Sequence, residues 1–271
     1  MAPRIAGATG LPSRLLGLPA RCAAALALIV LAAAPAAHAG PAKIADGKDL
    51  IRAMHERYRH DWYETLTFEQ ASITHNPDGT SKSEIWHEAA MLPGRLRIDM
   101  GEPRQGNGAL IADGKLTRFQ AGKATVSRPL VHMLLVLGFD VYRQPARRTI
   151  EEVASQGFDL TKMHEDTWDG AAVYVVGADA GDLRTKQFWI DRKRLLFVRL
   201  IEPDERDRTK TDDTRFTDYR RTSPGWVAAR VEFYLGGRNV FSEHYSDIQV
   251  NPKLDPAIFD PRRFAYLHWE K

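Results

Sequence analysis

The sequence lacks most of the features from which an enzymatic site is recognised. It has a single cysteine, Cys22, so neither an internal disulfide nor a cysteine-based metal site can be assembled from it. It contains no His-Glu-x-x-His segment, no glycine-rich phosphate loop and no Gly-x-Ser-x-Gly elbow. No motif therefore specifies a reaction, and neither a cofactor nor a metal is predicted.

Acidic residues are absent from residues 1–39, which also contain the longest apolar run. Three arginines precede the run Ala23–Ala34, and Ala37-His38-Ala39 follows it. A basic start, an apolar stretch and small residues before a cleavage position are typical of a secretory signal peptide, here cut before Gly40. The run is shorter than the roughly 20 apolar residues that span a bilayer, so an uncleaved anchor is the weaker alternative. We therefore predict a periplasmic protein. No Arg-Arg pair precedes the run, which favours export of the unfolded chain.

An excess of basic charge is also absent once that segment is set aside. The chain has 38 Lys and Arg against 35 Asp and Glu, and Arg4, Arg14 and Arg21 lie within residues 1–39. Residues 40–271 are therefore balanced in charge, and they contain no cysteine. Balanced charge argues against nucleic acid as a partner and against an anionic membrane surface. No linker or repeat divides residues 40–271, so we predict one domain.

The predicted mature chain consists mainly of short alternating segments. Arg95–Met100 alternates apolar and charged residues, and Asp113-Gly114 joins two further segments, which is typical of a β-hairpin. An amphipathic helix capped by Asp49 precedes them, and its apolar stripe is Leu50, Ile51, Met54 and Tyr58. Together the segments predict about ten or eleven strands. They are Thr65–Thr74, Ser83–Leu92, Arg95–Met100, Ala109–Ala112, Leu116–Gln120, Ala171–Val176, Lys186–Asp191, Leu195–Ile201, Thr214–Arg220, Trp226–Leu235 and Val240–Val250.

The middle of the chain predicts two helices. Pro129–Leu137 is apolar nearly all round, and Thr149 with Glu152 forms a capping box for a second helix that ends at Gly157. His164-Glu165-Asp166 is interpreted as a polar turn. A helix that is apolar on every side must contact something on two sides. One side fits the sheet, and the other is left open between a ligand, a partner and another helix.

The histidines give only weak signals. His55, His60 and Asp61 are close in sequence, but a spacing of five places the two histidines on different faces of a helix, so a metal site is not predicted there. Three further histidines are polar candidates for the mouth of a cavity, where a hydrolase would need them. They are His87, His132 and His244.

Several local stretches occur in an order that points to one known family. They are Met91–Ile98, Ile111–Lys115, Phe188–Asp191, Phe216–Arg220 with Trp226–Tyr234, and Leu254–Phe259. With the export signal and the mid-chain helices, this order resembles the LolA/LolB-like superfamily of periplasmic outer-membrane lipoprotein-sorting proteins. The resemblance implies a large curved antiparallel sheet, an unclosed half-barrel. About three helices then cover its concave face, and acyl chains lie between helices and sheet.

On such a fold the apolar residues divide into a trough and a lid. The predicted trough residues are Trp86, Leu96, Ile98, Phe119, Phe188 and Phe233, and the predicted lid residues are Leu130, Met133, Leu134 and Leu137. An ordinary solid core under the helices is the alternative interpretation. The lipoprotein carriers place an Arg directly before the proline of the second hairpin strand, where it ties down the lid. Here Leu92 precedes Pro93, and Arg95 and Arg97 lie on the face opposite Leu96 and Ile98.

We therefore predict a mainly β periplasmic protein that binds lipid or an acylated protein without enzymatic activity. We expect it to be monomeric, with an envelope membrane protein as a further candidate partner. Two alternatives stay open. One is an envelope-stress sensor or protein-interaction module on the same fold, and the other, which is weaker, is a hydrolase.

Overall fold

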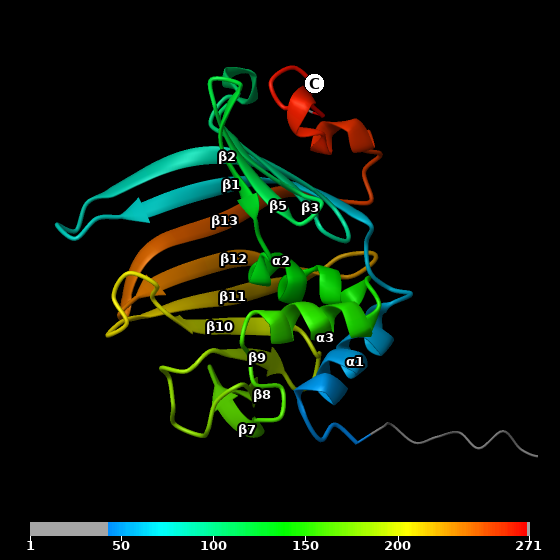
Figure 1. Cartoon of the computed structure of the whole chain (residues 1–271), viewed down its shortest axis with the longest axis vertical. Helices are drawn as coiled ribbons and strands as arrows, with labels where there is room; N and C mark the ends of the chain where they lie inside the picture. Colours follow the sequence, from blue (N-terminus) through cyan, green and yellow to red (C-terminus); the bar gives the residue numbers. More distant parts are fainter. Residues whose placement is uncertain (1–42, 270–271) are drawn as a thin grey trace, which may run out of the picture. The chain divides into compact units, whose positions relative to one another are not determined.

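The computed structural model describes residues 43–269, which belong to one compact unit. The predicted signal peptide and its cleavage position lie outside the described residues. Within residues 43–269, no helix is both long enough and apolar enough to cross a membrane. The protein is mainly β, with one antiparallel sheet of 13 strands that does not close into a barrel (Figure 1). The predicted fold class is thereby confirmed.

The sheet is built from two meanders that meet at their ends. Strands β1 to β6 follow one another across the sheet, as do β7 to β13, and the pairing of β1 with β13 joins the two runs. The strands are β1 Thr65–His75, β2 Ser81–Met91, β3 Arg95–Met100, β4 Gly108–Ala112, β5 Lys115–Gln120, β6 Lys123–Pro129, β7 Met163–Trp168, β8 Ala171–Val176, β9 Gln187–Asp191, β10 Phe197–Pro203, β11 Thr211–Arg221, β12 Trp226–Leu235 and β13 Arg238–Val250.

This topology explains why helices cover one face. The two edge strands, β6 and β7, are consecutive in the chain but lie at opposite edges of the sheet. The connection between them must therefore cross the sheet, and it does so as α2 (Met133–Gly138), a 3₁₀ turn (Asp140–Tyr142) and α3 (Ala146–Ser155). Helix α1 (Gly47–Tyr58) packs against this connection, and all three helices lie on the same side of the sheet (Figure 1).

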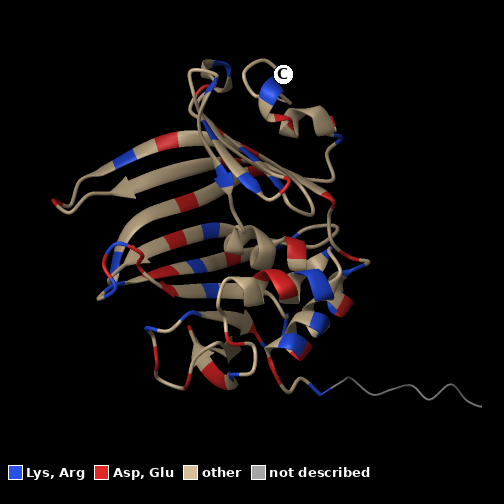
Figure 2. Cartoon of the chain, in the orientation of Figure 1, with Lys and Arg blue, Asp and Glu red and all other residues tan. Residues whose placement is uncertain are grey.

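The other face of the sheet is covered at one end by the C-terminal segment. Two 3₁₀ turns, Pro256–Phe259 and Pro261–Arg263, pack there on strands β3 and β4. Their apolar side chains form a second cluster with Ala89, Leu110 and Phe119. Part of the sheet is therefore apolar on both faces, which explains why β2 carries apolar residues on both sides. Charges of both signs are spread over the helices and strands (Figure 2).

The two strands that the sequence did not predict are the two edges of the sheet. Every residue of β6 is exposed, and β7 contains His164, Glu165 and Asp166, which were interpreted as a turn. An edge strand pairs on one side only and here buries little side-chain surface, so no apolar alternation marks it. The interpretation of His164-Glu165-Asp166 as a turn is therefore wrong.

The helix boundaries differ from the prediction at their starts. Asp46, not Asp49, caps α1 and accepts a hydrogen bond from the Asp49 N–H at 2.9 Å, although the predicted apolar stripe of α1 is buried. Helix α2 begins only at Met133, because β6 extends to Pro129. Helix α3 begins at Ala146, so Thr149 is not its cap but lies buried within the helix.

Candidate ligand-binding cavity

A cavity of about 140 Å³ lies between α2 and the sheet. Its walls come from the helix side, from strands β1 to β3 and from strands β11 to β13, and most of its lining is apolar. The lining residues are Phe68, Glu88, Ala90, Leu96, Ile98, His132, Leu134, Leu135, Phe139, Phe216, Val231, Phe233, Glu243 and Tyr245.

Strand register brings the wall residues together. Ala90 pairs with Leu96 across β2 and β3, and Glu88 pairs with Ile98. On the other side of the cavity, Phe216 pairs with Val231 across β11 and β12. Because side chains alternate along a strand, every second residue of these segments faces the helices. The alternating sequence of β3 therefore places two of its residues, Leu96 and Ile98, in the cavity lining.

Helix α2 supplies the opposite wall, and a histidine caps its N-terminus. The side chain of His132 accepts a hydrogen bond from the Leu135 N–H at 3.2 Å and so caps α2. Burial lowers the pKa of His132 to about 4, which keeps the ring neutral and able to accept this bond. Leu134, from the first turn of α2, lines the cavity, while Leu137 is fully buried.

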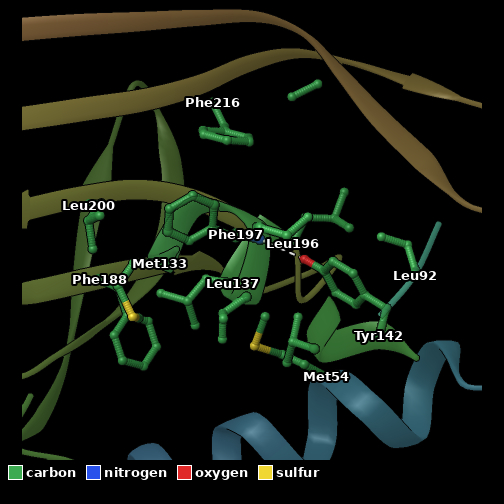
Figure 3. Packing of buried hydrophobic residues seen from close by; sticks show 14 of the residues in the cluster. Met54, Leu92, Met133, Leu137, Tyr142, Phe188, Leu196, Phe197, Leu200 and Phe216 are labelled. Carbon is green, nitrogen blue, oxygen red and sulfur yellow. Dashed lines mark hydrogen bonds between the residues drawn. The ribbon is translucent and has the colours of Figure 1, made fainter. Parts of the chain in front are cut away.

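The side of the helix-covered face over strands β9 and β10 is filled rather than hollow. Met133 and Leu137 of α2 belong to one buried cluster with Phe188 and Phe197 (Figure 3). The Tyr142 hydroxyl accepts a hydrogen bond from the Phe197 N–H at 2.9 Å and ties the crossing connection to β10. Phe188 and Phe197 are fully buried here, and neither lines the cavity.

Only part of the predicted trough and lid meets at the cavity. Leu96, Ile98 and Phe233 line it, as does Leu134 from the lid. Phe188, Met133 and Leu137 lie in the filled region instead. Leu130 lines a neighbouring hollow of about 280 Å³.

Phe119 is not part of the trough. It lies on the opposite face of the sheet, where its ring stacks on Phe264 at a centroid distance of 4.0 Å. The prediction failed because the C-terminal segment covers that face, so an apolar residue there is buried without facing the helices.

Trp86 lies on the cavity side of β2, beyond the end of the cavity. Alternation places it on the same side of β2 as Glu88, and its ring is 5.6 Å from that of Phe241, centroid to centroid. Phe241 is in turn 5.6 Å from Phe233, which lines the cavity. The three rings form an aromatic strip leading out of the cavity, and we refer to Trp86, Phe241 and Phe233 by that name below.

Two carboxyl groups, those of Glu88 and Glu243, line the cavity beside the polar groups of His132 and Tyr245. Burial raises the pKa of Glu88 well above its usual range, and the nearby Glu243 raises it further. Burial also raises the pKa of Glu243 to about 7, although hydrogen bonds from Tyr245 and Gln70 oppose the rise. The Tyr245 hydroxyl donates to Glu243 Oε2 at 2.7 Å. The sequence analysis missed both acids, because a glutamate in a strand is normally a solvent-facing residue.

A third buried carboxyl group connects the turn after α2 to the β2–β3 hairpin. Asp140, in the turn after α2, is 2% exposed and accepts a hydrogen bond from the Gly94 N–H at 3.0 Å. Gly94 lies in the β2–β3 hairpin, two residues after Leu92, the position at which the resemblance implied an arginine. Burial raises the pKa of Asp140 to about 7. Lid and hairpin are thus connected by an acid on the lid and a backbone donor on the hairpin.

Arg97 has another role on the far side of the sheet. Its guanidinium is fully buried, pairs with Asp99 at 2.8 Å, and donates to the carbonyls of Ile258, Phe264 and Leu267. It therefore anchors the C-terminal segment and does not reach the lid.

The histidines proposed for a hydrolase do not assemble in the cavity. His132 lines the cavity and caps α2, whereas His87 and His244 alternate with Glu88 and Glu243 and so lie on the other side of their strands. Within residues 43–269, no cluster of three or more His, Cys, Asp or Glu side chains is arranged to hold a metal ion.

The sequence matches no family model and no curated protein. Solved structures are nevertheless similar. A DUF1329 family protein from Desulfovibrio piger superposes with a TM-score of 0.52 and 16% identity, over 79% of this chain and 95% of the other. An outer-membrane lipoprotein-sorting protein domain from Vibrio parahaemolyticus superposes with a TM-score of 0.51 and 12% identity, over 81% of this chain and 98% of the other. A LolA superfamily protein from Nitrosomonas europaea superposes with a TM-score of 0.48 and 15% identity, over 77% of this chain and 96% of the other.

The first two structures share the fold of this chain. The half-barrel implied by the sequence resemblance is therefore confirmed as the fold. The structural similarity establishes the architecture. Sequence identities this low do not identify a ligand.

Proposed function

We propose that this protein is a periplasmic carrier that binds the hydrocarbon part of a lipid or an acylated protein between α2 and the sheet. The observation that carries the proposal is the apolar cavity under a short helix. Residues 1–39 supply the export signal in this proposal. The protein acts as a monomer without a catalytic step, and an envelope membrane protein is its candidate loading or unloading partner.

The driving force is burial of hydrocarbon. Each CH₂ group moved from water into an apolar site is stabilised by about 0.8 kcal/mol. A cavity of about 150 Å³ accepts a benzene ring, so the present 140 Å³ admits a short length of chain. A longer chain fits if it continues along the aromatic strip or if α2 moves outwards.

The lid is suited to such movement. Helix α2 has 6 residues, and Leu134 and Leu135 of its first turn contact the cavity. The Asp140–Gly94 hydrogen bond connects the far end of this helix to the β2–β3 hairpin. Loops and lids open on the microsecond to millisecond scale in other ligand-binding proteins. Because Met133 and Leu137 of the same helix are buried in the filled region, an outward movement of α2 also loosens its contacts there.

Direct extraction tests the proposal. The protein is purified from the periplasm without detergent, extracted with organic solvent, and the extract is examined by mass spectrometry. The proposal expects a co-purifying acyl compound in stoichiometric amount. An extract without lipid, together with an unchanged melting temperature on addition of acyl ligands, would contradict it, because a ligand that binds the native state raises that temperature.

A cavity-filling variant links any bound lipid to this site. Ile98→Phe enlarges a side chain that lines the cavity, whereas Ile85→Phe enlarges one that is 46% exposed. We expect Ile98→Phe to lose the co-purifying lipid and Ile85→Phe to retain it. Equal lipid in both variants would place the lipid elsewhere.

A further inference from the structure

The carboxyl groups of the cavity have no basic counterpart. Its ionisable lining residues are Glu88, His132, Glu243 and Tyr245, and no lysine or arginine contributes to it. His132 is held neutral by burial. An apolar cavity with two acids and no fixed cation is unsuited to a fatty carboxylate or a phosphate, since either anion would lose its hydration there without gaining a cationic partner.

Two acceptors at this site are left without donors. Glu88 is 5% exposed and lines the cavity, yet within residues 43–269 its carboxyl group receives no hydrogen bond. Gln70 is fully buried, and its Oε1 also has no partner among the described residues. Buried polar groups in folded proteins are nearly always paired, so unpaired ones beside a cavity indicate that a ligand supplies the donors.

These acceptors lie around one strand. In β1, Phe68 pairs with Glu88 of β2, and Gln70 pairs with Tyr245 of β13. Ser72, two residues further along β1, is opposite Glu243. The carboxyl groups thus lie on the two strands that flank β1, with the Gln70 side chain between them. Glu88 and Glu243 line the cavity, so a group with several donors can approach both carboxyl groups from it.

We propose that the cavity binds an amphiphile whose head group is a protonated amine, with Glu88 and Glu243 accepting its hydrogen bonds. The inference rests on the proposed carrier function and specifies the ligand class. The hydrocarbon part of the ligand lies against Leu96, Ile98 and Phe233 and continues along the aromatic strip. An ammonium group has three N–H donors and a positive charge, so it can donate to both carboxyl groups and pair with the one that has lost its proton.

The same arrangement makes binding depend on pH. Without a ligand, burial and mutual repulsion favour the protonated form of both acids, and Glu243 loses its proton as the pH rises through its pKa of about 7. An ammonium group replaces such a proton. Since the pKa of Glu243 is about 7, affinity for an amine should rise about tenfold between pH 6 and pH 8. Affinity for a neutral amphiphile should not rise.

Three probes of equal chain length test the proposal on the wild-type protein. Octylamine, octanol and octanoate differ only in the head group, and their dissociation constants can be measured by calorimetry at pH 6 and pH 8. We expect octylamine to bind most tightly and octanoate to bind least tightly. The affinity for octylamine should rise between pH 6 and pH 8. Octanol binding equal to octylamine binding would overturn this inference but support the carrier proposal. Absence of binding by all three would contradict both.

Isosteric variants assign the effect to the two acids. Glu88→Gln and Glu243→Gln should each weaken octylamine binding roughly ten- to a hundredfold and leave octanol binding unchanged. Glu84→Gln is the matched control, because Glu84 is an exposed acid on the same side of β2 outside the cavity lining. Unchanged octylamine affinity in both Gln variants would overturn the inference. Glutamine has the size of glutamate, and circular dichroism verifies that each variant is folded.

Discussion

One face of this sheet has two regions that differ although the same helices cover both. Over strands β9 and β10, large side chains such as Phe188 and Phe197 are fully buried against the helices and do not line the cavity. Over strands β1 to β3 and β12 to β13, the space between α2 and the sheet contains a cavity and two acids. The filled region holds the crossing connection in place, and the hollow region is where a ligand can enter.

Helix α2 contributes side chains to both regions. Leu134 and Leu137 are one turn apart on a helix of 6 residues, but Leu134 lines the cavity while Leu137 is fully buried in the filled region. The same short segment thus contributes both to the packed cluster and to the cavity wall. Substitutions in the two regions should therefore separate stability from binding.

The largest contrast is expected from truncating these two leucines. Leu137→Ala leaves a hole in a packed cluster and should lower the free energy of unfolding by about 2–5 kcal/mol. Leu134→Ala extends a cavity that already exists and should cost less than about 1 kcal/mol while changing ligand affinity. Urea denaturation of both variants measures the difference. Equal losses would mean that the two regions are packed alike.

A smaller effect, with a defined pH dependence, is expected from Glu243→Gln. The folded-state pKa of Glu243, about 7, lies above its ordinary value of 4.5, so the folded protein holds this proton more tightly than the unfolded chain. Stability conferred by the protonated form is complete below pH 4.5 and is lost as the pH rises to about 7. Glutamine has no proton to lose. The variant should therefore gain about 1–3 kcal/mol over the wild type between pH 4.5 and pH 8.

Denaturation at both pH values checks this prediction, with Glu84→Gln as the control. Glu84 is exposed on the same strand as Glu88, so its replacement should leave the pH dependence of stability unchanged. A Glu243→Gln variant whose advantage does not grow with pH would show that the acid is better solvated than the cavity geometry indicates.

The sequence was most informative where a strand is covered on one face only. In β3, alternation placed Leu96 and Ile98 correctly on the helix side, and both line the cavity. In β5 the same reasoning misplaced Phe119, because the C-terminal segment buries the opposite face as well. Burial on both faces removes the contrast on which alternation depends. The apolar stretch Leu254–Phe259 was the only signal of that second layer.

The polar half of the site could not be predicted from composition or periodicity. Glu88 and Glu243 occur in strands whose neighbouring residues include solvent-facing polar groups, so nothing local marks them as buried. Their position follows from the pairing of β1 with both β2 and β13, a contact between segments far apart in the chain. Asp140 gave a clearer signal, since it interrupts an apolar stretch between Phe139 and Val141.

That interrupted stretch provides a test of how the hollow region is closed. Asp140→Asn keeps a carbonyl oxygen for the Gly94 N–H, whereas Asp140→Ala removes the acceptor. We expect the alanine variant to be less stable than the asparagine variant by about 1 kcal/mol. Hydrogen exchange at the Gly94 amide should be faster in the alanine variant only. Equal exchange in both would mean that this bond does not hold the lid to the hairpin.

The smallest effect is expected at the edge of the sheet beyond the hollow region, where side chains contribute little. Val126 of β6 is 43% exposed, and the strand is joined to β5 through backbone pairing. Val126→Thr keeps the branched shape that suits a strand and should change the free energy of unfolding by no more than about 0.5 kcal/mol. Octylamine affinity should also stay the same. A larger loss of stability or of binding would mean that β6 shapes the cavity through its side chains, and the boundary of the hollow region would then extend to the edge of the sheet.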